Sequence, residues 1–160
     1  MATATRKTAA RTAKPQDAIA LLKADHKKVS ELFEQFQKST SVARKKKLVE
    51  QICTELTVHT EIEEEIFYPA VKAALKDHEL VPEANVEHAS IKALIAQVKS
   101  VEPDGEMYNA RVKVMSEFVK HHVKEEHTEM FPKAKKSKLD MVELGAQLAA
   151  RKAELLRAAR

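Results

Sequence analysis

The chain has very little cysteine, glycine and proline. Its single cysteine, Cys53, excludes an internal disulfide and is typical of a protein from a reducing compartment. Only two glycines and five prolines interrupt 160 residues, and Ala, Leu, Glu, Lys and Gln, which enter helices at little cost, are plentiful. This composition predicts an all-α fold.

Long apolar runs are also missing. No stretch approaches the roughly 20 residues needed to cross a bilayer, and the N-terminus lacks the apolar segment of a secretory signal. We therefore expect a cytoplasmic protein without a membrane partner. Glycine-rich phosphate loops and GxSxG elbows are absent too, so phosphoryl and acyl transfer have no support.

The net charge of +4 comes from the start of the chain. Four bases, Arg6, Lys7, Arg11 and Lys14, lie in a segment without acids, and the rest of the chain has 24 basic and 24 acidic residues. Residues 2–14 are only Ala, Thr, Lys and Arg, without a large apolar side chain, so we interpret residues 1–15 as a disordered basic arm. Lys133 to Lys138 form a second basic run. Because no aromatic residues interleave these lysines, nucleic acid is not an expected partner.

Apolar residues recur at three- and four-residue steps in five segments, as on one face of an α-helix. The expected helices are Asp17–Gln37, a long helix after the turn at 38–41, a third from Pro82 to about Val101, a fourth from Glu106, and a last one capped by Asp140. Pro69 should kink or stop the second helix, and Pro132 should terminate the fourth. In the fourth helix, Met115, Phe118 and Val119 are predicted to face inward.

Short connections between long helices favour antiparallel neighbours. We therefore predict an up-down-up-down four-helix bundle over residues 16–133, formed around a single core. Residues 134–160 should supply a C-terminal extra helix that docks on the outside of the bundle.

Each of the four bundle helices carries a histidine on its apolar stripe. A single histidine there is usually a hydrogen-bonded core residue, but one on every helix is harder to explain by packing alone. The four are His26, His59, His88 and His122.

Two of these histidines are followed four residues later by a glutamate, His59 by Glu63 and His122 by Glu126. Positions four apart differ by about 40° around a helix, so both side chains can reach one ion. The same rotation directs Glu64 and Glu65 away. His127 is likewise predicted to face outward as an ordinary exposed residue, together with His121 and His78.

Carboxylates buried in an apolar bundle cost several kcal/mol each unless they are compensated, and metal ions would compensate them. Four imidazoles and two carboxylates exceed what one tetrahedral zinc site needs. The set fits two metal ions, each bound by two histidines and bridged by Glu63 and Glu126, with water, oxo or hydroxo ligands completing the shells. Imidazole with carboxylate suits iron among the redox metals, although zinc and manganese accept the same ligands.

Another bundle architecture for two metals uses Glu-x-x-His motifs. No histidine here has a glutamate three residues before it. The order His-x-x-x-Glu therefore argues against that architecture.

The sequence resembles the hemerythrin-like proteins with an HHE cation-binding domain, over about residues 17 to 133. The motifs that carry the resemblance are Asp25-His26, His59-Thr60-Glu61-Ile62-Glu63-Glu64 with Phe67-Tyr68-Pro69, Glu87-His88, and His122-Val123-Lys124-Glu125-Glu126 with Phe131-Pro132. The resemblance implies a non-haem di-iron centre that binds dioxygen or a related small molecule.

One position departs from the oxygen-carrying members of that family. Their third helix supplies a second histidine where this chain has Lys92. The resemblance then points to the bacterial proteins linked to oxidative or nitrosative stress and to repair of iron centres, and we expect an open or water-filled position on the metals.

Three functions remain open at this level. The first is a di-iron protein that binds or senses oxygen, peroxide or nitric oxide, or handles iron. The second is a di-iron enzyme with catalase-like or oxidase activity, or an iron donor for cluster repair. The third is a metal-free helical interaction module.

Four further residues have predicted roles. Tyr68 is a candidate hydrogen-bond donor near the metals. Glu55 and Glu129 are candidates for orienting an imidazole. Cys53 is expected to be a packed thiol.

Overall fold

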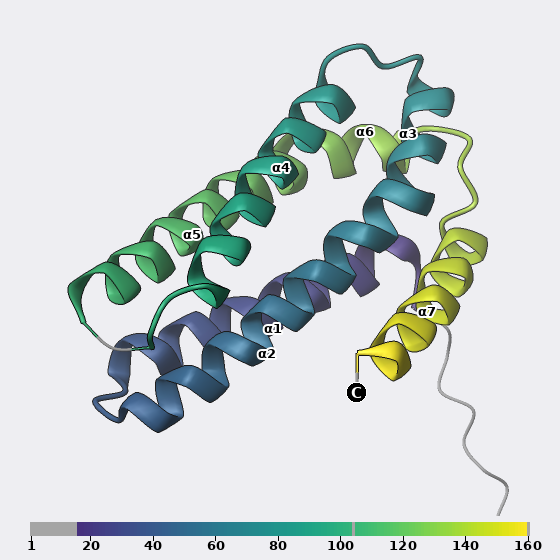
Figure 1. The fold of residues 1–160 in the computed structure, drawn as a ribbon. Helices are drawn as coiled ribbons and strands as arrows, with labels where there is room; N and C mark the ends of the chain where they lie inside the picture. Colours follow the sequence, from purple (N-terminus) through teal and green to yellow (C-terminus); the bar gives the residue numbers. More distant parts are fainter. Residues whose placement is uncertain (1–15, 104, 160) are drawn as a thin grey trace, which may run out of the picture.

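The molecule is built from two antiparallel helical hairpins, as Figure 1 shows for the computed structural model. Helices α1 (Ala18–Lys38) and α2 (Val42–Ile62) form the first hairpin, and α4 (Leu80–Lys99) and α5 (Glu106–Glu125) form the second. The structure describes residues 16–103 and 105–159, so the arm predicted at 1–15 lies outside it. Within the described ranges, no helix combines the length and apolarity needed to cross a membrane.

The second helix of each hairpin widens into a π-helical turn and then continues as an α-helix. After α2 come η1 (Glu63–Phe67) and α3 (Tyr68–Leu75); after α5 come η2 (Glu126–Met130) and α6 (Phe131–Lys136). The prediction that Pro132 terminates the fourth helix is wrong, because the chain stays helical to Lys136. Pro69 and Pro132 both lie in the first turn of the new α-helical segment, where the missing N–H and the ring are tolerated.

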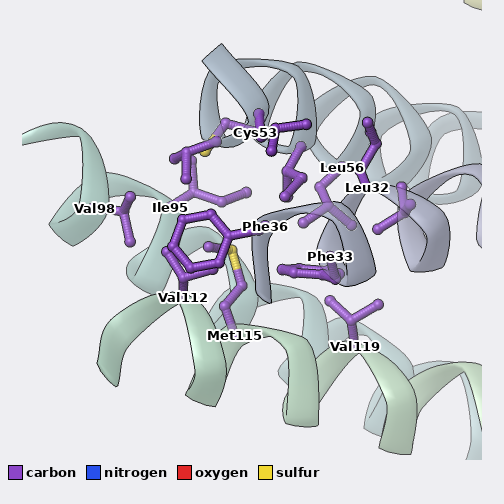
Figure 2. Packing of buried hydrophobic residues seen from close by; sticks show 14 of the residues in the cluster. Leu32, Phe33, Phe36, Cys53, Leu56, Ile95, Val98, Val112, Met115 and Val119 are labelled. Atoms are coloured by element: carbon purple, nitrogen blue, oxygen red, sulfur yellow. The ribbon is translucent and has the colours of Figure 1, made fainter. Parts of the chain in front are cut away.

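Two buried apolar clusters lie at opposite ends of the bundle. Figure 2 shows the first, in which residues of α1 and α2, including Phe33, Phe36 and Leu56, pack against residues of α4 and α5. The second cluster joins the start of α1 to α3, α6 and α7. The predicted inward position of Phe118 is wrong, since this side chain is 45% exposed while Met115 and Val119 fill the interior beside it.

Helix α7 (Met141–Ala158) docks against α1, α2 and η1 on the outside of the bundle, as predicted for the C-terminal helix (Figure 1). Asp140 caps it, accepting hydrogen bonds from the backbone N–H groups of Val142 and Glu143. Gly145 permits the close approach, because a Cβ at this position would lie 2.2 Å from the carbonyl oxygen of Gln16. The docked helix therefore extends the core and reaches the side chains of the bundle interior.

Candidate metal centre

All six side chains predicted as metal ligands meet between the two apolar clusters. His26 is the most exposed of them at 9%, and Glu63 is completely buried. They come from α1, α2, η1, α4, α5 and η2: His26, His59, Glu63, His88, His122 and Glu126. The four helices thus bring their polar residues to one depth of an otherwise apolar core.

The four imidazoles share one orientation, with Nε2 turned inward and Nδ1 outward. The Nε2 atoms of His26 and His59 are 3.1 Å apart, and those of His88 and His122 are also 3.1 Å apart. The histidines therefore form two pairs, and the two members of each pair come from the two helices of one hairpin.

The two glutamates connect the histidine pairs. Glu63 Oε1 lies 2.9 Å from His59 Nε2 and 3.4 Å from His88 Nε2. Glu126 Oε1 lies 2.9 Å from His122 Nε2 and 3.4 Å from His26 Nε2. Each carboxylate therefore reaches the histidine four residues before it and also one histidine of the other pair.

The outward nitrogens of three histidines have partners from a neighbouring element. Asp25 Oδ2 accepts from His59 Nδ1 at 2.9 Å, and Glu87 Oε1 accepts from His122 Nδ1 at 2.9 Å. A carboxylate bound to Nδ1–H leaves the lone pair on Nε2, which is the form that binds a metal. Asp25 on α1 therefore orients His59 on α2, and Glu87 on α4 orients His122 on α5.

The residues expected to orient an imidazole, Glu55 and Glu129, do not do so. Glu55 pairs with Lys28 at 2.7 Å near the surface, and Glu129 is exposed. The sequence signal that could have found the correct acids is the pair of dipeptides Asp25-His26 and Glu87-His88. Neighbours on a helix point about 100° apart, so each acid faces the adjacent antiparallel helix rather than its own histidine.

His127 is not the ordinary exposed residue that was predicted. Its Nε2 is 2.8 Å from Nδ1 of His26, and the side chain is partly buried. Helical rotation predicts only whether a side chain faces the bundle axis. It does not reveal this contact, which forms because Nδ1 of His26 on α1 points towards the side of η2 that carries His127. Burial and the neighbouring His26 lower the pKa of His127.

Tyr68 lies at the centre of the second histidine pair, consistent with its predicted role as a donor. Its hydroxyl is 3.1 Å from Nε2 of both His88 and His122 and donates to Glu126 Oε2 at 3.3 Å. Burial and the negative charges of Glu63 and Glu126 raise the pKa of Tyr68 well above its ordinary value. The phenol therefore keeps its proton and serves as a buried donor.

Charge is concentrated in this small volume. Burial alone would lower the pKa of His59, but the Glu63 carboxylate and the hydrogen bond to Asp25 hold it well above its ordinary value. Burial likewise opposes the charge of His122, yet hydrogen bonds to Glu126 and Glu87 raise its pKa to about 10. For Glu63 burial is outweighed by the charge of His59, and its pKa is well below normal. Without a metal, protonated imidazoles thus compensate the buried carboxylates of the site.

The donor set fits metal ions better than it fits protons alone. Glu63 Oε2 is buried without a polar partner in the described part of the chain, and the buried Oε1 atoms of Glu63 and Glu126 face imidazole nitrogens of the site. Ligands about 2.1 Å from one ion and at right angles to each other are about 3 Å apart, which matches the spacing of the Nε2 pairs. Two buried groups have ligand atoms within 4.8 Å of one another: His26, His59, Glu63 and Glu126, and Glu63, His88 and His122.

Lys92, at the position where oxygen-carrying hemerythrins have a further histidine, is turned away from this centre. Its Nζ pairs with Glu64 at 2.6 Å, and the lysine side chain is exposed. Glu64 in turn lies 3.7 Å from His88 Nδ1. The second histidine pair therefore gains no additional ligand from α4.

Lys152 of α7 extends the chain of contacts behind His59. Its ammonium group pairs with Asp25 Oδ1, whose other oxygen holds His59. Burial alone would raise the pKa of Asp25, but His59 and Lys152 hold it below its ordinary value. The C-terminal helix therefore supplies the cation that compensates a buried carboxylate next to the centre.

Lys152→Met should lower the free energy of unfolding of the metal-free protein by about 1 to 3 kcal/mol, because Asp25 then remains buried with one partner fewer. Chemical denaturation measures the change. Arg151→Met is the matched control, since Arg151 pairs with Glu65 and Glu154 at the surface and its loss should matter much less. Equal effects of the two variants would contradict a specific role for Lys152.

The comparisons with known proteins agree with this geometry. Residues 17–134 match the family described as Hemerythrin HHE cation binding domain, and the chain belongs to that family. It is a metal-binding helical protein of this class, and the resemblance read from its motifs is confirmed.

Two individual proteins illustrate the relationship. A solved structure of a hemerythrin HHE cation-binding domain-containing protein from Mycobacterium kansasii has the same fold, with a TM-score of 0.77, 24% identity and 89% of each chain covered. A protein named DNA nickase from Nostoc sp. strain PCC 7120 is 31% identical over 111 residues, or 69% of this chain. The matched region spans only 31% of that relative's length.

Proposed function

We propose that the protein holds two iron ions and binds a small oxidant, namely oxygen, peroxide or nitric oxide. In this proposal His26 and His59 bind one ion, His88 and His122 bind the other, and Glu63 and Glu126 contribute to both. The single observation that carries the proposal is the buried ring of inward Nε2 atoms with an oxygen of Glu63 and an oxygen of Glu126 between the two histidine pairs. Iron bound there would supply redox chemistry to a small ligand.

A small internal cavity beside the histidines supports the size of the proposed ligand. It measures about 20 Å³, and its lining combines the four imidazoles, Asp25 and Thr60 with apolar side chains. This is room for a molecule of one or two heavy atoms. The apolar residues that line it are Val29, Leu56, Ile91, Val119 and Val123. An apolar wall favours an uncharged diatomic molecule over a hydrated ion.

Enzymatic turnover of peroxide is the second candidate, and Tyr68 favours it. A phenol that keeps its proton, 3.1 Å from two inward nitrogens, can donate a hydrogen bond to a ligand in the site. Nicking of DNA, the activity in the name of the Nostoc relative, is not proposed for this site, because the six side chains are buried too deeply to contact a polynucleotide.

Metal content and optical absorption test the proposal. Protein reconstituted with ferrous iron without oxygen and then dialysed should retain two iron ions per chain. Exposure to oxygen, peroxide or nitric oxide should then change its absorption spectrum. Stoichiometric binding of the small molecule supports the binding function, whereas steady turnover of peroxide supports the enzyme.

One result would overturn the proposal, and a second would overturn only the expected open position on the metals. Retention of less than one iron ion per chain would remove the di-iron centre. Tight, reversible oxygen binding with slow autoxidation would contradict a centre with an open position, since Lys92 leaves α4 with one histidine.

A further inference from the structure

A second group of metal-ligand side chains lies outside the buried centre, on the face formed by α4 and α5. Nε2 of His121 is 3.1 Å from Glu125 Oε1 and 3.5 Å from Glu87 Oε2. These three ligand atoms lie within 4.8 Å of one another, and His121 is 67% exposed. The proposed iron site uses neither His121 nor Glu125.

A small cleft lies between the two glutamates of this group and the buried centre. The cleft has a volume of about 10 Å³, with Glu83, Glu87 and Glu125 among its outer residues and His122 and Glu126 among its buried ones. Glu126 is 1% exposed, its Oε1 lies 2.9 Å from His122 Nε2, and its Oε2 accepts from Tyr68. A buried carboxylate of the inner centre thus lies in the wall of a cleft whose opening carries three more carboxylates.

Glu87 belongs to the exposed group and also contacts a histidine of the buried one. Its Oε1 accepts from His122 Nδ1 at 2.9 Å, and its Oε2 faces His121. A cation bound by His121, Glu125 and Glu87 would therefore be separated from an inner imidazole by a single carboxylate. No other residue of the described chain joins the exposed group to the buried one in this way.

The charge around the centre favours cation uptake from this face alone. On the opposite face the buried Asp25 is already paired with the Lys152 ammonium, which repels an incoming cation. On the α4–α5 face, no Lys or Arg within the described ranges forms an ion pair with Glu83, Glu87 or Glu125. Acidic side chains around a cleft raise the local cation concentration.

We propose that Glu87, His121 and Glu125 form an outer site for a divalent metal ion, which captures the ion before it passes to the buried centre. One imidazole and two carboxylates suit ferrous, manganous, cobaltous or zinc ions. Because the ligands are exposed, the ion exchanges readily with solvent, as a loading site requires. The inward transfer rests on the proposed function, whereas the outer site rests on its own contacts.

Titration of metal-free, full-length protein with Co²⁺ tests both parts, since cobalt absorption reports the coordination of each ion. The wild type should bind two ions tightly and a third more weakly. His121→Ala should still bind two ions tightly, lose at least about tenfold in affinity for the third, and fill the inner sites about tenfold more slowly in stopped-flow measurements at limiting Co²⁺. His78→Ala is the control, because His78 is an exposed histidine in the loop before α4.

Several outcomes would overturn the inference. These are a third ion that His121→Ala retains, a loss of the third ion in both alanine variants, and inner sites that fill at the wild-type rate in His121→Ala. Failure of the proposed function looks different. In that case wild-type protein binds only the one weakly held ion at the outer site and none at the buried centre.

Discussion

Glu63→Gln protein is expected to retain at most one metal ion per chain after dialysis, where the wild type retains two. Glu63 belongs to both buried groups of converging ligand atoms, its Oε1 faces His59 and His88, and its Oε2 has no polar partner within the described chain. An amide offers one neutral acceptor oxygen in place of a charged carboxylate, so affinity should fall at least about a hundredfold. Elemental analysis of the dialysed protein measures the loss.

Glu64→Gln is the matched control for this variant. Glu64 is the next residue in the chain, but it pairs with Lys92 at the surface, so its replacement should leave two ions bound. The thermal midpoint gives an independent readout. Metal at a hundred times its Kd adds about 2.7 kcal/mol of stability to the wild type, and this gain should be small in Glu63→Gln. Two ions retained by Glu63→Gln would show that Glu63 is not a ligand.

Metal affinity is expected to rise steeply with pH up to about pH 10. In the metal-free protein the pKa of His122 is raised to about 10, and that of His59 is also well above normal, so both imidazoles hold protons at pH 7. A metal must displace one proton at each histidine pair, which corresponds to about a tenfold gain in affinity per pH unit for each ion. Calorimetric titration in buffers of different ionisation enthalpy counts the protons released. An affinity independent of pH between 7 and 9 would contradict this account.

The stability of the metal-free protein should change with pH in the opposite direction. Because the folded-state pKa of His122 lies above the unfolded value of about 6.5, its stabilising contribution is complete below pH 6.5 and is lost as the pH rises towards 10. The loss is on the order of a few kcal/mol for this residue. Urea denaturation of metal-free protein at pH 7 and pH 9.5 would measure it.

The sequence was sufficient to predict the bundle and the six converging side chains, and the reason is helical periodicity. Apolar stripes place Val29, Ile52, Ile91 and Met115 in the core. The same rotation places a glutamate four residues after a histidine on the same face, and it separates Glu63 from the exposed Glu65. Properties that repeat along one helix can therefore be predicted without knowledge of the other helices.

Contacts between helices could not be predicted in the same way. Asp25 reaches His59, Glu87 reaches His122 and His127 reaches His26 only because particular helices lie side by side at a particular depth. Lys152 reaches Asp25 only because α7 docks on α1. The two π turns could not be predicted from apolar periodicity, because the α-helical pattern assumes a constant rise and rotation per residue. Relative axial position is a property of the packed bundle and not of any single segment.

The two hairpins carry the same ligand order: an acid before a histidine on the first helix, then His-x-x-x-Glu, a π turn and a Phe-Tyr-Pro or Met-Phe-Pro segment on the second. Each hairpin thus supplies half of the ligand set in the same order. The contacts behind the two acids differ, because Asp25 is paired with Lys152 from α7 whereas Glu87 faces His121 of its own hairpin. The six ligands are therefore pseudo-symmetrical while their surroundings are not, and the two halves of the centre have unequal electrostatic environments.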